Sequence, residues 1–187
     1  MNFIEEYQLS DPGISDDYVE LFKKANAAGI TKPGVTAKGL NPAVKQSTDF
    51  ILDEADRIGA PFSLWERYYK ELWNFVQDYI TKYRFMEFGG RFDMKFLPVI
   101  QYYRPGEGFK VWHIDAAQKE QCDRAMVYIT YLNDVPNGGT MFYHQNYKTI
   151  AQRGKTIIFP AGYTHLHKGE ISQTHEKYIL TGWIWWD

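Results

Sequence analysis

The spacing of apolar residues changes near residue 95, and this change constrains the fold more than any other feature of the sequence. Before it, apolar side chains recur at helical spacing; after it, short runs alternate with a period of two, which is typical of strands. Eight such runs are separated by turn-forming sequences such as PGEG, NDVPNGG and PAG. They span residues 95–104, 109–115, 124–133, 139–144, 147–151, 155–160, 164–169 and 177–186. Strands this short and this closely spaced favour an antiparallel sandwich or jelly roll.

The first half of the chain contains two segments with a helical pattern. Residues 15–29 begin with Ser15 as the expected N-cap and end at Gly29. Residues 63–84 form a long amphipathic pattern. Its apolar face comprises Leu64, Tyr68, Leu72, Phe75, Val76 and Ile80. Between the two helices, we expect residues 30–42 to be a polar connection and residues 43–57 to be irregular or briefly helical. The sequence thus predicts a single α+β domain over residues 1–187, with mainly helical support in 1–90 and a β core in 91–187.

Composition excludes several classes of protein. The hydrophobic fraction of 44% and the charged fraction of 24% are those of an ordinary globular domain. A net charge of −2 offers no electrostatic footprint for nucleic acid. Cys122 is the only cysteine, so neither an internal disulfide nor a thiolate metal cluster is expected. The first residues do not resemble a secretory signal, and no run approaches the ~18 apolar residues of a membrane span. We therefore expect a cytoplasmic protein with no membrane partner.

Two potential metal ligands stand two residues apart in the sequence VWHIDAAQ. On a strand, His113 and Asp115 would project to the same face. The run THLHKG offers a third ligand, either His165 or His167, which would also share a face. Two histidines and one carboxylate leave coordination positions open, as in non-haem Fe(II) oxygenases. A zinc hydrolase is disfavoured because no H-E-x-x-H motif appears.

A lysine lies on the apolar final run, ten residues after His167. If Lys177 faces inward, an anion must await it, because an unpaired buried ammonium costs several kcal/mol. Thr181 would share its face and could add a hydroxyl donor. Such a pair suits the distal carboxylate of a small keto-diacid. The alternative is an edge lysine that points to solvent.

Five segments in this order resemble the 2-oxoglutarate/Fe(II)-dependent dioxygenases, and most closely their prolyl hydroxylase branch. They are YYRPGEGFKVWHID, RAMVYITYLND, NGGTMF, FPAGYTHLHKG and KYILTGW, and together they cover roughly residues 95–187. The resemblance implies a double-stranded β-helix core, a jelly roll, with the N-terminal helices packed on it. It also implies Fe(II), 2-oxoglutarate and O₂ as cofactor and co-substrates, with ascorbate as a further requirement.

Residue roles follow from the same resemblance. His113, Asp115 and His167 match the iron ligands, and the ten-residue offset to Lys177 favours His167 over His165. Lys177 matches the residue that binds the C5 carboxylate of 2-oxoglutarate. Its expected supports are Tyr103, Tyr131 and Thr181. Arg124 and Trp183 match positions that contact the target proline, although Trp183 could equally be a core residue.

The implied activity is hydroxylation of a prolyl residue in a peptide or protein, coupled to conversion of 2-oxoglutarate to succinate and CO₂. The carboxylate of Asp115 favours hydroxylation over halogenation, which requires its absence. Alternatives are another target, such as a lysyl residue or free proline, and a non-catalytic module that binds a metal or a partner. His144 and His175 are expected to be surface histidines. Aromatic residues near the motif could line its mouth or simply pack; they are Tyr102, Phe109 and Trp112.

Overall fold

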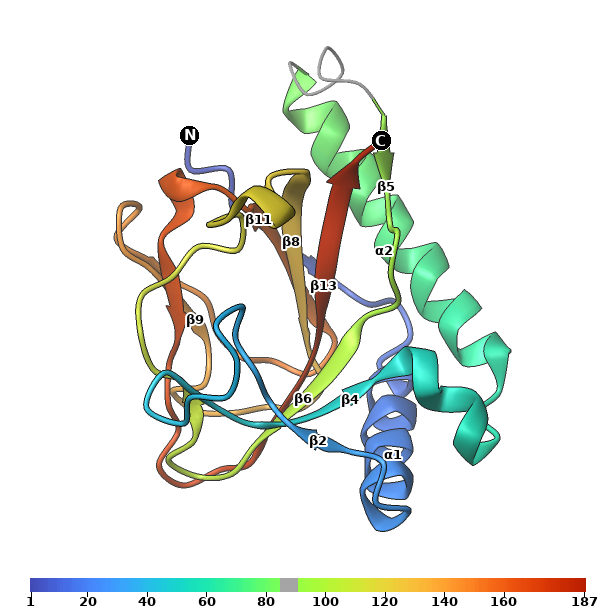
Figure 1. Cartoon of the computed structure of the whole chain (residues 1–187). Helices are drawn as coiled ribbons and strands as arrows, with labels where there is room; N and C mark the ends of the chain where they lie inside the picture. Colours follow the sequence, from blue (N-terminus) through green and yellow to red (C-terminus); the bar gives the residue numbers. More distant parts are fainter. Residues whose placement is uncertain (85–90) are drawn as a thin grey trace.

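The computed structural model describes residues 1–84 and 91–187, and its centre is a large antiparallel sheet with helices on one face (Figure 1). The strand order is β1-β11-β8-β13-β6-β4-β2, and β5 also pairs with β13. These strands are β1 (Glu5–Gln8), β2 (Lys32–Pro33), β4 (Thr48–Ile51), β5 (Phe92–Asp93), β6 (Val99–Tyr103), β8 (Arg124–Tyr131), β11 (Lys155–Pro160) and β13 (Lys177–Trp186). The smaller sheets are β10-β9-β12 and β3-β7. Their strands are β3 (Lys45–Gln46), β7 (Gly108–Phe109), β9 (Thr140–Phe142), β10 (Tyr147–Lys148) and β12 (His167–Gly169). This architecture confirms the α+β jelly roll that the sequence predicts.

Helices α1 (Gly13–Ala27) and α2 (Phe62–Lys82) cover one face of the large sheet. Alternate residues of β8 explain how one strand serves both faces: Met126 and Tyr128 belong to the helix-side core, whereas Val127 and Ile129 belong to a second core on the opposite face. The Tyr68 hydroxyl of α2 also hydrogen-bonds the buried Thr130 hydroxyl at 2.8 Å. The helices therefore cover this face and leave the opposite one for a site.

Strands β11 and β13 have the bounds that alternation predicts, but the first half of the chain differs from expectation. Helix α1 begins at Gly13, after Pro12, and Ser15 is buried inside it rather than capping it. Residues 30–57 form β2, β3, β4 and a 3-10 helix, Leu52–Ile58. Because β1 and β4 are strands of the large sheet, residues 1–90 contribute more than helical support; residues 85–90 lie outside the described part.

The expected strands around the motif histidines are shorter than predicted. Within 109–115 only Phe109 belongs to a strand, and His113 makes a single bridge to His167. Within 164–169 the 3-10 helix η4 (Tyr163–His165) precedes β12, so His165 and His167 do not share a face. Alternation could not reveal these irregularities, since turns inside a run leave the apolar pattern intact. Among the described helices, none combines the length and the hydropathy that crossing a membrane requires.

Candidate functional site

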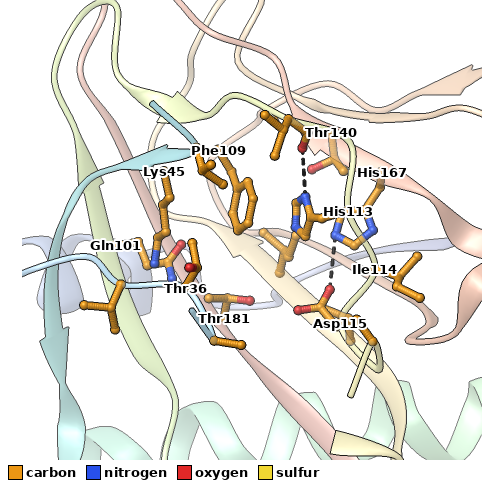
Figure 2. A pocket seen from close by; sticks show the side chains of 18 of the residues that line it. Thr36, Lys45, Gln101, Phe109, His113, Ile114, Asp115, Thr140, His167 and Thr181 are labelled. Carbon is orange, nitrogen blue, oxygen red and sulfur yellow. Dashed lines mark hydrogen bonds and ion pairs between the residues drawn. The ribbon is translucent and has the colours of Figure 1, made fainter. Parts of the chain in front are cut away.

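A cavity of about 660 Å³ lies on the face of the large sheet that the helices leave open. Its walls come from β6, β8 and β13 of that sheet, from β9 and β12 of a smaller sheet, and from residues 35–45 of the connection before β4. His113, Asp115 and His167 line it together and turn toward one another (Figure 2). The sequence-predicted residues Lys177, Tyr103, Tyr131, Thr181, Arg124 and Trp183 also line this cavity.

His113, Asp115 and His167 each offer a ligand atom, and these atoms lie within 4.8 Å of one another. The Nδ1 atoms of the histidines are oriented by backbone carbonyls, at 3.1 Å from Val111 O for His113 and 2.9 Å from His165 O for His167. This arrangement leaves Nε2 of each ring for a metal, as is usual for histidine ligands. Asp115 Oδ2 lies 3.2 Å from His167 Nε2, yet it is buried without a hydrogen-bond partner. An orphaned carboxylate oxygen beside two imidazoles fits a divalent cation.

The protonation states of these side chains also suit a metal. Burial lowers the pKa of His113 to about 4, so its imidazole is neutral at pH 7. Burial alone would raise the pKa of Asp115, but His167, His113 and the Trp183 N–H together lower it to about 2. The carboxylate is therefore ionised and the imidazole of His113 is unprotonated, as metal ligation requires.

His165, the competing third ligand, lies outside the cavity lining. Its Nδ1 is 2.9 Å from the Thr164 hydroxyl and its Nε2 is 2.8 Å from the carbonyl oxygen of Asn2. Both ring nitrogens are thus engaged, and the geometry favours His167. His144 and His175 are exposed and away from the cavity.

Lys177 is buried in the cavity with 5% of its surface exposed. Its ammonium donates to the carbonyls of Gly138 at 3.1 Å and Glu170 at 3.0 Å, and no carboxylate of the described residues hydrogen-bonds it. Burial lowers its pKa to about 8. The inward orientation excludes the solvent-facing alternative and leaves a cation that forms no ion pair in the described part of the chain.

Tyr103, Tyr131 and Thr181, which the sequence predicts to lie around Lys177, make different contacts. The Tyr103 ring lies 5.0 Å from the Lys177 ammonium, and its hydroxyl donates to Gln101 at 2.6 Å. The Tyr131 hydroxyl lies 2.8 Å from the hydroxyl of Thr140. The Thr181 hydroxyl donates to the carbonyl of Tyr128 at 2.9 Å, so it faces the cavity as an acceptor rather than as the expected donor.

Arg124 and Trp183 contact Asp115. The Trp183 indole N–H donates to Asp115 Oδ1 at 3.1 Å, and Arg124 Nη1 donates to the Asp115 carbonyl at 3.0 Å. The guanidinium lies 3.7 Å from the centroid of the Trp183 ring, which is a close cation–π contact. Both side chains therefore hold Asp115 in place, a role that the sequence did not suggest.

We expect Trp183→Phe to weaken metal binding because it removes the hydrogen bond to Asp115 Oδ1 while preserving the aromatic stack. Loss of such an orienting partner typically lowers metal affinity by roughly 10- to 100-fold. Titration of the apo protein with Co(II), followed by its visible absorption, measures this change. Trp186→Phe is the matched control, because Trp186 stacks on Phe92 outside the cavity. Unchanged Co(II) affinity in Trp183→Phe would contradict a positioning role.

Several cavity residues were not found by sequence reasoning. Lys45 and Gln101 also line the cavity, and Thr140 lies beside Tyr131. Lys45 and Asp49 stand four residues apart in a segment that the sequence left irregular, so no periodicity marked them. Among the aromatic candidates, Phe109 stacks on His113, whereas Tyr102 packs in the helix-side core and Trp112 packs against Tyr143.

Comparison with known proteins agrees with this geometry. The model of the 2OG-Fe(II) oxygenase superfamily matches residues 98–185. No curated protein matches the chain. A Pseudomonas putida prolyl-4-hydroxylase structure covers 99% of this chain and 94% of its own, with a TM-score of 0.74 at 16% identity. A Trichoplax adhaerens prolyl hydroxylase in complex with a hypoxia inducible factor peptide fragment covers 99% and 84%, with a TM-score of 0.77 at 15% identity.

A third similar structure is the viral collagen prolyl hydroxylase of Paramecium Bursaria Chlorella virus-1 in its 2OG complex. It covers 99% of this chain and 97% of its own, with a TM-score of 0.68 at 18% identity. At such identities the three structures establish the fold alone. The family match identifies residues 98–185 as similar to the 2OG-Fe(II) oxygenase superfamily, and the H-x-D motif and the distant histidine of this region lie together in one cavity.

Proposed function

We propose that this protein is a 2-oxoglutarate- and Fe(II)-dependent hydroxylase of prolyl residues in a peptide or protein. One observation carries the proposal: the two-histidine, one-carboxylate cluster shares its cavity with a buried lysine that forms no ion pair with any described residue. A facial set of ligands leaves positions for a chelating co-substrate and O₂. The lysine supplies a fixed anion site for the far end of that co-substrate.

His113, Asp115 and His167 would hold the iron, with Nε2 of each ring and the unpartnered Oδ2 of Asp115 as the ligand atoms. Bound iron and 2-oxoglutarate would supply the oxidising chemistry, in which one oxygen atom of O₂ enters a C–H bond as 2-oxoglutarate becomes succinate and CO₂. Lys177 would bind the C5 carboxylate, with Tyr103 and Tyr131 beside it.

The remaining contributions of the chain are orientation and exclusion of water. Phe109 stacks on His113 with ring centroids 3.5 Å apart, and Trp183 and Arg124 fix Asp115 from the other side. Aromatic surfaces of this kind keep the reacting centre dry. Arg124 and Trp183 also remain our candidates for contact with the substrate proline, because both line the cavity.

Support for proline as the target comes from the three similar structures, all of prolyl hydroxylases. The test is succinate formation from 2-oxoglutarate with Fe(II), O₂ and ascorbate, with and without proline-containing peptides. We expect peptide-stimulated turnover and a product 16 Da heavier at proline. If only free proline or a lysyl peptide stimulates turnover, the oxygenase activity is supported and the prolyl-peptide substrate is wrong. No turnover by the iron-loaded protein would favour a binding module.

A further inference from the structure

A second buried lysine, Lys45, lies in the same cavity as Lys177, and the proposed function leaves it unused. Only 5% of its surface is exposed. Strands β3 and β7 pair so that Lys45 lies opposite Phe109, the residue that stacks on His113. In Figure 2, Lys45 lies beside Gln101 and Thr36 on the left of the cavity, whereas the metal-ligand cluster lies to the right. Lys45 therefore lines the reaction space, and in Figure 2 Phe109 lies between it and His113.

The ion-pair partner of Lys45 is Asp49, which lies in the large sheet. Asp49 of β4 pairs with Gln101 of β6, which pairs with Ile179 of β13, so the three residues form one row across the sheet. The Lys45 ammonium donates to Asp49 Oδ2 at 2.7 Å, and the other Asp49 oxygen accepts from the Ser47 hydroxyl at 2.7 Å. The ion pair fixes the ammonium at the end of this row.

This corner of the cavity, around Lys45 and Gln101, has hydrogen-bond donors without partners but few unpartnered acceptors among the described residues. An ammonium has three N–H groups, and the described residues accept from only one of those of Lys45. The side-chain oxygen of Gln101 accepts from Tyr103 at 2.6 Å, while its amide N–H groups have no partner among the described residues. Both oxygens of Asp49 are already engaged. Such a corner suits an anion with planar oxygens, that is, a carboxylate.

The charge of the cavity also favours an anionic ligand. Its basic lining residues are Lys38, Lys45, Arg124 and Lys177, and Asp115 is the only acidic one among the described lining residues. The whole chain nevertheless has a net charge of −2, so positive charge is concentrated here. Divalent iron and the 2-oxoglutarate dianion would offset each other. A positive potential would remain for whatever binds next, and it favours an anionic partner.

We propose that Lys45 and Gln101 form a second anion subsite, which binds a carboxylate of the substrate. This inference rests on the proposed function, since it specifies the chemistry of that substrate. Lys177, which has no carboxylate partner among the described residues, serves the co-substrate, and Lys45, already fixed by Asp49, serves the substrate. The carboxylate belongs either to an acidic side chain next to the hydroxylated residue or to a chain terminus. Both sources present the same group.

The first experiment measures binding without turnover. Protein loaded with Mn(II) and 2-oxoglutarate is titrated calorimetrically, without O₂, with matched probes. One pair of capped peptides differs only in Glu or Gln beside proline, and a second pair ends at proline as the free acid or the amide. We expect the carboxylate member of one pair to bind at least tenfold more tightly than its neutral twin. The pair that discriminates identifies the source of the carboxylate.

The second experiment removes the subsite. Lys45→Met alone would leave Asp49 unpaired in a largely buried position, so the double variant Lys45→Met/Asp49→Asn removes both charges and guards against misfolding. We expect it to lose the preference for the carboxylate probe while the Kd of 2-oxoglutarate changes by less than about twofold. Lys45→Arg should retain the preference. Lys155→Met is the matched control, because Lys155 forms an equally short ion pair with Glu6 outside the cavity.

The outcomes separate this inference from the function on which it rests. Equal affinity within both probe pairs overturns the subsite, even if the peptides are hydroxylated. An undiminished preference in the double variant overturns it as well. Tighter binding of a carboxylate probe supports the subsite if the preference depends on Lys45, whether or not the probe is hydroxylated. A probe that binds in this way but is not hydroxylated at proline would count only against proline as the target.

Discussion

Asp115→Ala is expected to abolish 2-oxoglutarate turnover and to lower metal affinity by at least about 100-fold. Losing a group that merely orients a ligand costs roughly 10- to 100-fold, and Asp115 is proposed as a ligand itself. Co(II) titration and succinate formation measure the two effects. Asp123→Ala is the matched control, because this nearby carboxylate pairs only weakly, at 3.8 Å, with Lys95.

The apo form of Asp115→Ala should still fold, but at pH 7 it should unfold at a somewhat lower temperature than the apo wild type. The low pKa of Asp115 shows that its neighbours favour the ionised carboxylate in the folded state, and the substitution also removes the hydrogen bond from the Trp183 indole. The loss should be small, because Oδ2 of the same carboxylate is buried without a hydrogen-bond partner. A thermal unfolding scan with and without metal checks this point. An inactive variant that has also lost its apo stability would show misfolding rather than loss of a ligand.

Lys177→Met is expected to weaken 2-oxoglutarate binding by at least about 100-fold, because losing one partner of a buried ion pair costs roughly 3–5 kcal/mol. The free variant should be as stable as the wild type or more so, since methionine removes a buried ammonium to which residues 1–84 and 91–187 offer no carboxylate partner. Calorimetry of the Mn(II) form measures the Kd, and Lys155→Met again serves as the control. Unchanged affinity for 2-oxoglutarate in Lys177→Met would assign the co-substrate to another cation of the cavity.

The same lysine predicts a pH dependence. Burial depresses the pKa of Lys177 to about 8 in the free protein, so its positive charge is present below that pH and is lost as the pH rises through it. Only the charged form binds the C5 carboxylate. The Kd of 2-oxoglutarate should therefore rise about tenfold between roughly pH 7 and pH 9. Lys177→Arg should show a flatter profile, because a guanidinium stays charged over this range.

Much of the fold could be predicted because regular strands carry their own signal. The runs 155–160 and 177–186 coincide with β11 and β13, where alternation is unbroken and both ends have turn residues or charges. The helix over 63–84 differs by two residues or fewer at either end. The prediction that Ser15 is an N-cap was wrong. A serine near a helix start resembles a cap, but here Pro12 precedes the first turn and Ser15 is buried inside the helix.

The site was harder to predict where it depends on contacts distant in sequence. The ten-residue offset to Lys177 favours His167 over His165, but no local pattern shows that the ring nitrogens of His165 contact Thr164 and Asn2. Lys45 enters the cavity through its strand pairing with Phe109, 64 residues along the chain, which no local pattern records. The hydrogen bond from Trp183 to Asp115 likewise joins segments 68 residues apart.

The position of β13 at the middle of the large sheet affects how the protein is made. β13 lies between β8 and β6 and is the last strand in sequence, while β1, the first, pairs with β11. During synthesis, neither half of the sheet can join the other until residues 177–186 have left the ribosome. Pairings so distant in sequence also make folding slow. If the proposed iron site is correct, a nascent chain should bind the metal only after residues 177–186 have been translated.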